Sequence, residues 1–285
     1  MNNHKTNLNM KKIVMFFLLV GGSVFAQSKE TRQVSDFKSV KASQGIEVNF
    51  TYGGAKSVVV EVEKSENMKD VKTETTITGG LDIFIDQKTN KKWKNGINIR
   101  DFGKVVVTIN NPSLEEVRLS SSAKFNLLNK AVAKSFDVKT SSSARFRGEL
   151  VQADNLSIEA SSSSKIEGSF EVTKKSSASV SSSASVDISL KTKTGDFGAS
   201  SSARLSLSGN ADSVSASASS SGSIKGSSFT TKTLEGKASS SGSMVFNVTE
   251  EVSGRASSSG RVQYTGGAKI VSSNTSSSGQ VKNID

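Results

Sequence analysis

The sequence predicts an all-β protein folded as a parallel β-helix, and three observations lead to this fold class. A serine triplet followed by a small residue recurs nine times, at intervals of 18 to 21 residues. Within each copy, apolar and polar residues alternate with a period of two, which is typical of half-buried strands. No stretch after residue 26 has the period of an amphipathic helix. A fixed period of this length indicates stacked repeats, here with about 20 residues per turn.

Residues 1–26 have the features of a secretory signal peptide. Lys5, Lys11 and Lys12 form a positive segment, and an apolar run over 13–20 follows it. Small residues then lead to Ala26, an acceptable cleavage site. The apolar run is too short and too soon interrupted by glycine to predict a membrane span. We therefore expect export, with the protein in the periplasm, on the outer surface or outside the cell, and no transmembrane segment in the mature chain.

Residues 27–115 differ from the repeats and predict an N-terminal β cap, or irregular first turns of the helix. Turn signals such as Gly53-Gly54 and Asn95-Gly96 separate short apolar runs. A cap is expected because the open end of a parallel stack exposes unpaired backbone groups. The runs predict strands at 37–40, 46–52, 57–63, 71–77, 81–85, 97–99 and 104–109.

Residues 116–285 hold the serine-rich repeats. The triplets begin at Ser120, Ser141, Ser161, Ser181, Ser200, Ser219, Ser239, Ser257 and Ser276. In the second copy, one parity holds Phe136, Val138, Ser142, Ala144 and Phe146. This parity predicts that the middle serine of each triplet points inward. Alternatively, the chain bends inside the triplet, and the inward–outward alternation of side chains is broken there. A disordered serine-rich linker fits the 34% hydrophobic content, but such linkers do not keep the alternation in register over nine copies.

One family resemblance follows from these residues. The run Arg32-Gln33-Val34-Ser35-Asp36-Phe37 through Gly45-Ile46-Glu47-Val48 resembles the opening of the auto-transporter adhesin head GIN domain, which is common in exported proteins of Bacteroidota. The strands around 58–62 and 79–83 fall where that family has its next two, and Ser-Ser-Ser-Ala/Gly is similar to its recurring Ser-Gly-Ser-Gly. The resemblance implies a right-handed parallel β-helix and a role at the cell surface, in adhesion or polysaccharide contact.

The position after each small residue should face outward once per turn and form a column. Five of its nine residues are cationic and none is acidic. A polyanion along the column would relieve the repulsion between stacked cations, which predicts an acidic polysaccharide or another envelope glycan as partner. The alternative is a charged face that only prevents aggregation. The candidate binding residues are Lys124, Arg145, Lys165, Arg204 and Arg261.

Trp93 is the sixth candidate binding residue. It is the only tryptophan, and it lies in a loop with Lys91, Lys92 and Lys94. Such an indole could stack on a sugar ring, or it could fold back onto the adjacent sheet.

The composition argues against catalysis. The chain has no cysteine, and its one histidine, His4, lies in the signal segment. Histidine bases, Ser-His-Asp triads and Cys or His metal sites are therefore excluded from the mature chain. We expect a non-enzymatic protein without cofactor or metal, and no nucleic-acid partner, because export and scarce aromatics argue against one. Two alternatives are open: an enzyme that acts on polysaccharide, and a scaffold that self-associates as a homo-oligomer through the C-terminal turn.

Overall fold

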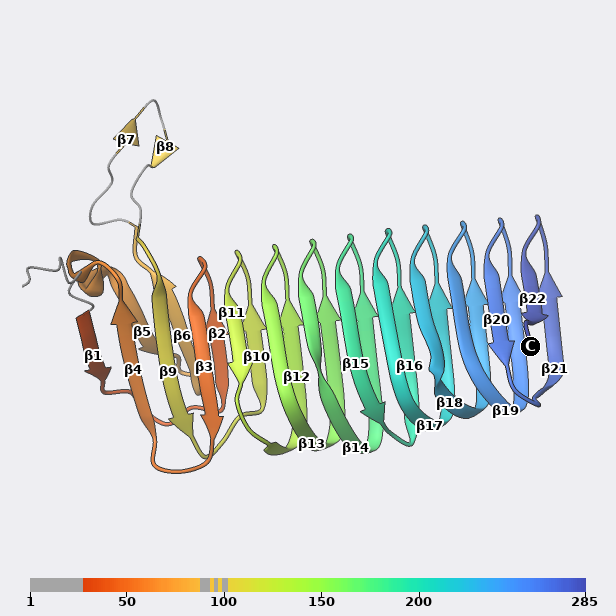
Figure 1. Cartoon of the computed structure of the whole chain (residues 1–285), viewed down its shortest axis with the longest axis horizontal. Helices are drawn as coiled ribbons and strands as arrows, with labels where there is room; N and C mark the ends of the chain where they lie inside the picture. The colour runs from red at the N-terminus through yellow and green to blue at the C-terminus, as the bar shows by residue number, and fades with distance from the viewer. Residues whose placement is uncertain (1–27, 88–92, 95–96, 99–101) are drawn as a thin grey trace, which may run out of the picture.

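The computed structural model describes residues 28–87, 93–94, 97–98 and 102–285. Nearly all of them lie in one long stack of β-strand coils, a β-solenoid (Figure 1). From residue 116 on, each coil contains one serine turn, and the nine serine turns delimit eight complete coils. The predicted all-β class and the period of about 20 residues are confirmed.

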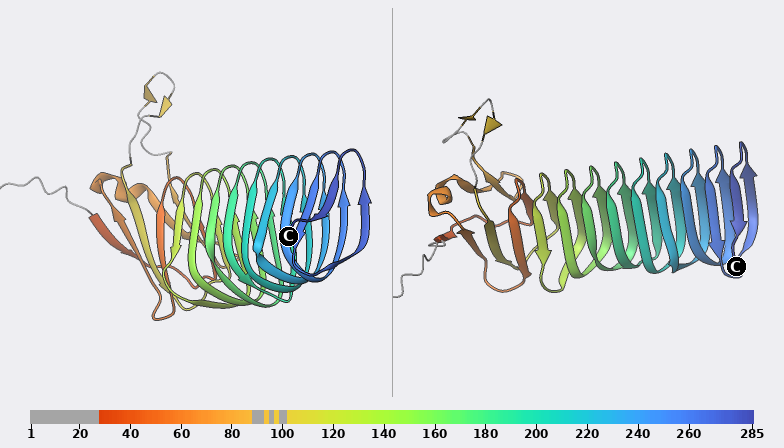
Figure 2. Two further views of the ribbon diagram at one scale, coloured as in Figure 1. Left: turned by 45° about the vertical axis from the view of Figure 1, so that its right-hand side comes forward. Right: turned by 45° about the horizontal axis from the view of Figure 1, so that its top comes forward.

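Each coil contains two strands that face each other across a narrow core. The chain leaves a serine turn, runs along one sheet, bends at the opposite side and returns along a second sheet (Figure 2). A whole coil is visible in β13 (Arg145–Ala160), where register shifts after Gly148 and Ala153 mark the bend. We call the strands that follow the serine turns the outgoing sheet, and those that precede the turns the returning sheet.

The strands of the repeats pair in parallel from coil to coil, so equivalent side chains stack along the axis. Arg145 pairs with Lys165, and Val138 pairs with Ile158. Neighbouring coils are therefore about 4.8 Å apart. These strands are β10 (Glu116–Leu119), β11 (Lys124–Leu127), β12 (Ala131–Thr140), β13 (Arg145–Ala160), β14 (Lys165–Val180), β15 (Ser185–Lys191), β16 (Thr194–Ala199), β17 (Arg204–Ala218), β18 (Ser223–Ala238), β19 (Ser243–Ala256), β20 (Arg261–Thr265), β21 (Lys269–Thr275) and β22 (Gln280–Asn283).

Side chains of one parity fill the core between the two sheets. The rings of Phe50, Phe125 and Phe146 are fully buried and stack along the axis, with centroids 5.6 and 5.8 Å apart. Farther along the stack, the ring of Phe197 on the returning sheet meets the ring of Phe229 edge to face. Each buried ring removes apolar surface from water, which stabilises the coil by roughly 1.5–3 kcal/mol.

The serine turns correct one expectation from the sequence. Ser142 and Ser143 have φ values of 50° and 63° and are both exposed, whereas Ala144 is buried. The Ala144 N–H donates to the Ser141 carbonyl at 3.1 Å and closes a four-residue turn. The prediction that the middle serine points inward is therefore wrong, and the alternative with a bend inside the triplet is confirmed. The chain must reverse between two closely packed sheets, and two consecutive residues at positive φ make that reversal.

The turns also hydrogen-bond to one another. The Ser143 N–H donates to the Ser162 carbonyl at 3.0 Å, and the equivalent bond joins every successive pair of serine turns. One further turn precedes the triplets: Gln44 and Gly45 have positive φ, and the Gly45 N–H donates to the Ser121 carbonyl at 2.9 Å. The stack of turns thus begins at Ser43, in a copy that carries no serine triplet.

The N-terminal part contains a 3₁₀-helix, η1 (Ser65–Asp70), as well as strands. Each of the seven predicted strands has a counterpart, whereas β1 and β7 were not predicted. The strands are β1 (Ser28–Arg32), β2 (Ser39–Ala42), β3 (Glu47–Tyr52), β4 (Ser57–Val62), β5 (Val71–Thr75), β6 (Gly80–Ile85), β7 (Trp93–Lys94), β8 (Ile97–Asn98) and β9 (Val105–Asn111).

This part both joins the stack and closes its end. The first coil, β2 and β3, lies between the β6 and β9 layer on one side and β10 and β11 on the other, all in parallel. Beyond that layer the pairing becomes antiparallel: β5 pairs with β6, β4 with β9, and β1 with β4 (Figure 1). The antiparallel strands cap the parallel stack at this end.

At the other end, β21 and β22 have neighbouring strands on one side only within the described residues. Every residue of β21 is exposed, including Ile270 and Val271. Self-association through this coil stays a prediction. No helix in the described part of the chain combines the length and hydropathy needed to cross a bilayer.

Candidate functional site

The five predicted cations lie in one column on the outgoing sheet. Lys124 pairs with Arg145 and Arg145 with Lys165, as consecutive register partners. The column continues through Ser185 to Arg204 and later reaches Arg261. All five cationic side chains are exposed, next to the serine turns. We call Lys124, Arg145, Lys165, Arg204 and Arg261 the basic row.

Only one member of the basic row is neutralised within the described residues. Lys165 forms an ion pair with Glu167 at 2.7 Å, and Arg147 donates to the same carboxylate at 3.2 Å. The hydrogen bond from Lys165 lowers the pKa of Glu167, and the bond from Arg147 adds to this effect. The other four cations of the row have no ion-pair partner in the described part of the chain, and they leave a line of uncompensated positive charge.

The returning sheet has a comparable column of cations, but there every cation except Arg255 has an ion-pair partner among the described residues. Lys41, Arg118, Lys139 and Lys237 occupy equivalent positions two residues before each turn. Each forms an ion pair with a carboxylate at 2.6–3.1 Å; the partners are Asp82, Glu116, Glu159 and Glu235, respectively. The two faces of the solenoid therefore differ in exposed charge, and the outgoing sheet has the excess of unpaired cations.

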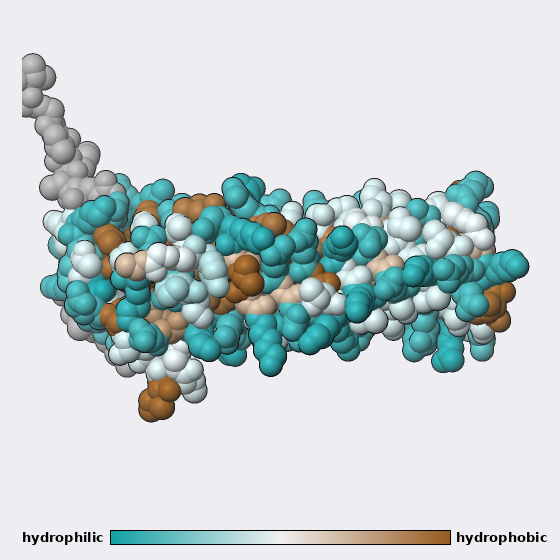
Figure 3. All heavy atoms as spheres, turned by 90° about the horizontal axis from the view of Figure 1, so that it is seen from below, coloured by the Kyte–Doolittle hydropathy of each residue, from teal (hydrophilic) through white to brown (hydrophobic). Residues whose placement is uncertain are grey.

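A groove runs along the bend side of the solenoid, opposite the serine turns. It has a volume of about 700 Å³ and spans five successive coils, from Val132 to Asp212. Seen from this side, a strip of apolar and weakly polar surface lies between hydrophilic side chains (Figure 3). Ala133, Ala153 and Val172 line its floor as small aliphatic side chains.

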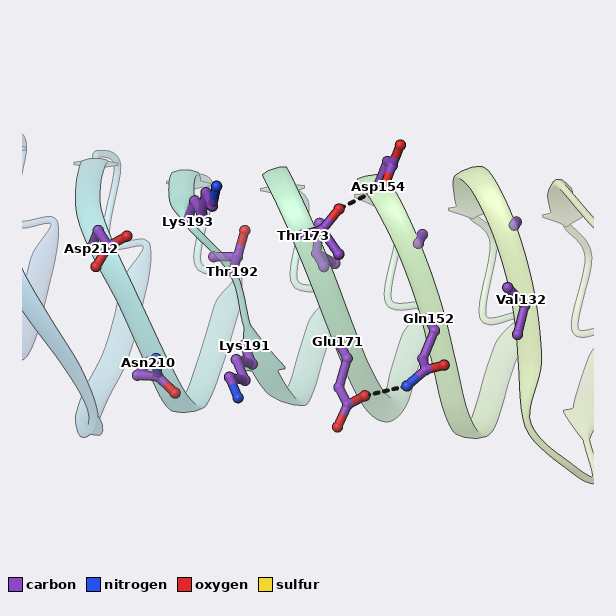
Figure 4. Close-up of a pocket in the computed structure, with 13 residues that line it drawn as sticks. Val132, Gln152, Asp154, Glu171, Thr173, Lys191, Thr192, Lys193, Asn210 and Asp212 are labelled. Carbon is purple, nitrogen blue, oxygen red and sulfur yellow. Dashed lines mark hydrogen bonds between the residues drawn. The ribbon is translucent and has the colours of Figure 1, made fainter.

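Two polar rims border this groove (Figure 4). The first rim consists of Gln152, Glu171, Lys191 and Asn210, which are register partners in consecutive coils. The second rim consists of Asp154, Thr173, Lys193 and Asp212. Each rim thus offers one polar side chain in each of four successive coils, and Val132 takes the first-rim position in the coil before them.

The carboxylates of the rims already have partners. Thr173 and Lys174 donate to Asp154 at 2.6 and 3.0 Å, and these hydrogen bonds lower its pKa. Gln152 donates to Glu171, and Lys232 forms an ion pair with Asp212 at 3.0 Å. Lys191 and Lys193 form no ion pair with any described residue. They flank the buried Thr192 in the fourth of the five coils that line the groove.

The sequence did not predict this groove. Its rim residues recur once per coil, but register shifts at the bends change their spacing from the serine turns. The remaining candidate, Trp93, begins β7, and its side chain lies outside the described residues. Across the described ranges, no three Asp, Glu, His or Cys residues cluster so as to hold a metal ion.

The comparisons with known proteins fit this architecture. The family model described as "Putative auto-transporter adhesin, head GIN domain" matches residues 36–174 and again residues 167–268. The chain belongs to this family. The resemblance of its opening strands and serine turns to the head GIN domain is thereby confirmed, and the two overlapping matches reflect the internal repetition. A search of curated proteins finds no match to this head GIN protein.

Solved structures share the fold of this head GIN domain. A "putative adhesin" from Parabacteroides merdae has a TM-score of 0.67 at 16% identity, covering 91% of this chain and 96% of its own. A "putative adhesin" from Parabacteroides distasonis has a TM-score of 0.64 at 19% identity, with 90% and 97% covered. A "putative lipid binding protein" from the same species has a TM-score of 0.59 at 17% identity, with 91% and 97% covered. At these identities the likeness establishes the fold alone.

Proposed function

We propose that this head GIN domain is an exported, non-enzymatic, adhesin-like protein of the cell envelope. Its outgoing sheet contacts acidic polysaccharide through the basic row. The family supports the adhesin-like role, and the signal-like residues 1–26 support export. The observation that carries the proposal is the line of four exposed cations on one face of the solenoid that have no ion-pair partner among the described residues.

The spacing of the basic row suits a long polyanion better than a small ligand. Lys124 and Arg261 lie seven coils apart, which corresponds to roughly 34 Å along the axis at the usual strand spacing. An extended acidic chain can meet several of these cations at once, and each contact displaces counterions. Individual contacts are weak at exposed positions, so binding depends on their number and falls as salt screens them.

A matched pair of triple variants tests the proposal. Lys124→Gln, Arg145→Gln and Arg204→Gln remove three unpaired cations of the basic row. Arg118→Gln, Lys139→Gln and Lys237→Gln remove three ion-paired cations of the returning sheet, with the same change in net charge. On an immobilised heparin column, we expect the basic-row variant to elute at clearly lower salt than the wild type, and the control variant to elute near the wild type.

The outcome separates a binding face from general basicity. Equal shifts for the two triple variants would show that retention follows net charge alone, because both lose three cations. An unchanged elution salt for the basic-row variant would mean that the basic row only keeps the protein soluble and binds no polyanion. Circular dichroism and the thermal midpoint of each variant show that the solenoid is intact, since exposed substitutions of this kind change stability little.

A further inference from the structure

The groove on the bend side is separate from the basic row. Arg145 and Gln152 belong to one coil but lie at opposite ends of its outgoing strand, seven residues apart. At about 3.3 Å per residue, the two surfaces are roughly 20 Å from each other. A ligand in the groove would therefore make contacts that the proposed function does not use.

The rims define a ligand that repeats along the axis. Gln152, Glu171, Lys191 and Asn210 follow one another at the coil spacing, which is about 4.8 Å. A pyranose ring linked through opposite positions advances by a similar distance. An extended glycan parallel to the axis can thus set successive sugars against successive coils. Amide, hydroxyl and ammonium groups supply the donors and acceptors that sugar hydroxyls need.

Other extended ligands fit the groove less well. A peptide strand binds by pairing with a free sheet edge, whereas the coils that line the groove already pair with coils on both sides. An acyl chain needs a deep apolar channel, whereas this floor consists of small side chains such as Ala133 and Ala153 between polar rims.

The charges indicate where an acidic sugar belongs. Asp154 and Asp212 form ion pairs with Lys174 and Lys232, whereas Glu171 accepts from the neutral amide of Gln152 and keeps its charge. Lys191 and Lys193, on opposite rims of the same coil, have no ion-pair partner among the described residues. Two cations against one remaining carboxylate leave the groove with a net positive charge, which lies in the fourth of its five coils.

We propose that this groove is a second binding site, which holds one linear glycan parallel to the solenoid axis. A carboxylate-bearing sugar of that glycan sits between Lys191 and Lys193. Gln152 and Asn210 bind the hydroxyls of flanking sugars, and Ala153 and Val172 contact the ring faces. The site is short, because about five coils take about five sugars.

Isothermal titration calorimetry with acidic hexasaccharides of hyaluronan, alginate and polygalacturonate tests the proposal. The full chain is compared with Lys191→Gln/Lys193→Gln, and with the control Arg118→Gln/Lys237→Gln, which removes two ion-paired cations of the returning sheet instead. We expect at least one hexasaccharide to bind, the groove variant to weaken that binding about tenfold, and the control to stay within twofold. Asn210→Ala should weaken it about threefold without any change in charge.

Each contrary result overturns the proposal. The first is that none of the three hexasaccharides binds. The second is that the groove and control variants lose hexasaccharide affinity equally. The third is that a fatty acid or an unstructured acidic peptide displaces the bound hexasaccharide. The result is distinguishable from the test of the basic row, which uses a long polymer and different residues. If heparin retention were unchanged in the basic-row variant while Lys191→Gln/Lys193→Gln weakened hexasaccharide binding, the basic row would be refuted and the groove supported.

Discussion

At the scale of single residues, the serine turns are the most unusual feature of this chain. The second and third serines of all nine triplets have φ between 47° and 63°. An L-residue in this region loses roughly 1–2 kcal/mol relative to the right-handed region. Two hydrogen bonds hold each turn except the last: one closes the turn, and the other joins it to the turn of the next coil. The positive φ values could not be predicted from the sequence, because serine, unlike glycine, is not typical of positions with positive φ.

Glycine should relieve this strain at a single turn. We expect Ser142→Gly to raise the free energy of unfolding by about 0.5–1 kcal/mol, since glycine adopts positive φ without penalty but loses more backbone entropy on folding. Ser142→Val should lower it by roughly 2 kcal/mol, because a β-branched side chain fits this region worst.

Urea unfolding of these variants gives the measurement. Ser141→Gly is the control, because Ser141 lies outside the positive-φ pair and should show no gain. A loss of stability in Ser142→Gly equal to that in Ser141→Gly would mean that the serine turn is not strained.

At the scale of elements, the strands could be predicted better than their partners. The alternation of side chains located each predicted strand of the N-terminal part, because burial of one face leaves a local signature. The order in which those strands stack could not be predicted. β2 pairs with β6 on one side and β10 on the other, and this depends on contacts between distant segments. β1 was missed because its sequence, Ser-Lys-Glu-Thr-Arg, has no apolar alternation.

The inner residue of the serine turns changes along the stack. It is alanine at Ala144 and Ala203 but glycine at Gly222 and at the three later turns. A Cβ at Gly222 would overlap the carbonyl oxygen of Ala199 in the preceding coil. The last four turns therefore approach their neighbours more closely than a methyl group allows.

Adding that methyl group should destabilise the coil. We expect Gly222→Ala to lower the free energy of unfolding by about 1–3 kcal/mol, the usual cost of overpacking. Ala203→Gly, one turn earlier, is the comparison, with an expected loss of about 1 kcal/mol from backbone entropy and the lost methyl group. Urea unfolding measures both. An unchanged stability in Gly222→Ala would show that the later turns can adopt the geometry of the earlier ones.

At the scale of the whole molecule, both candidate surfaces arise from repetition. The basic row could be predicted because it follows each turn at a fixed offset, so spacing alone aligns Lys124, Arg145 and Lys165. The groove could not be predicted, because it forms where register shifts interrupt the strands and where two rims from different parts of the coil converge. Regular strands thus produce the row, and irregular bends produce the groove.

Disulfide trapping tests the stacking itself most directly, because the native chain contains no cysteine. Arg145→Cys and Lys165→Cys place cysteines at register partners on adjacent coils. Their Cα atoms are about 4.8 Å apart, which is within the Cα–Cα range of a disulfide. We expect this pair to oxidise readily to an intramolecular disulfide. Arg145→Cys with Arg204→Cys, three coils apart at roughly 14 Å, should stay reduced. Free thiols in the first pair, or equal cross-linking in both, would contradict the stacked solenoid and the aligned basic row.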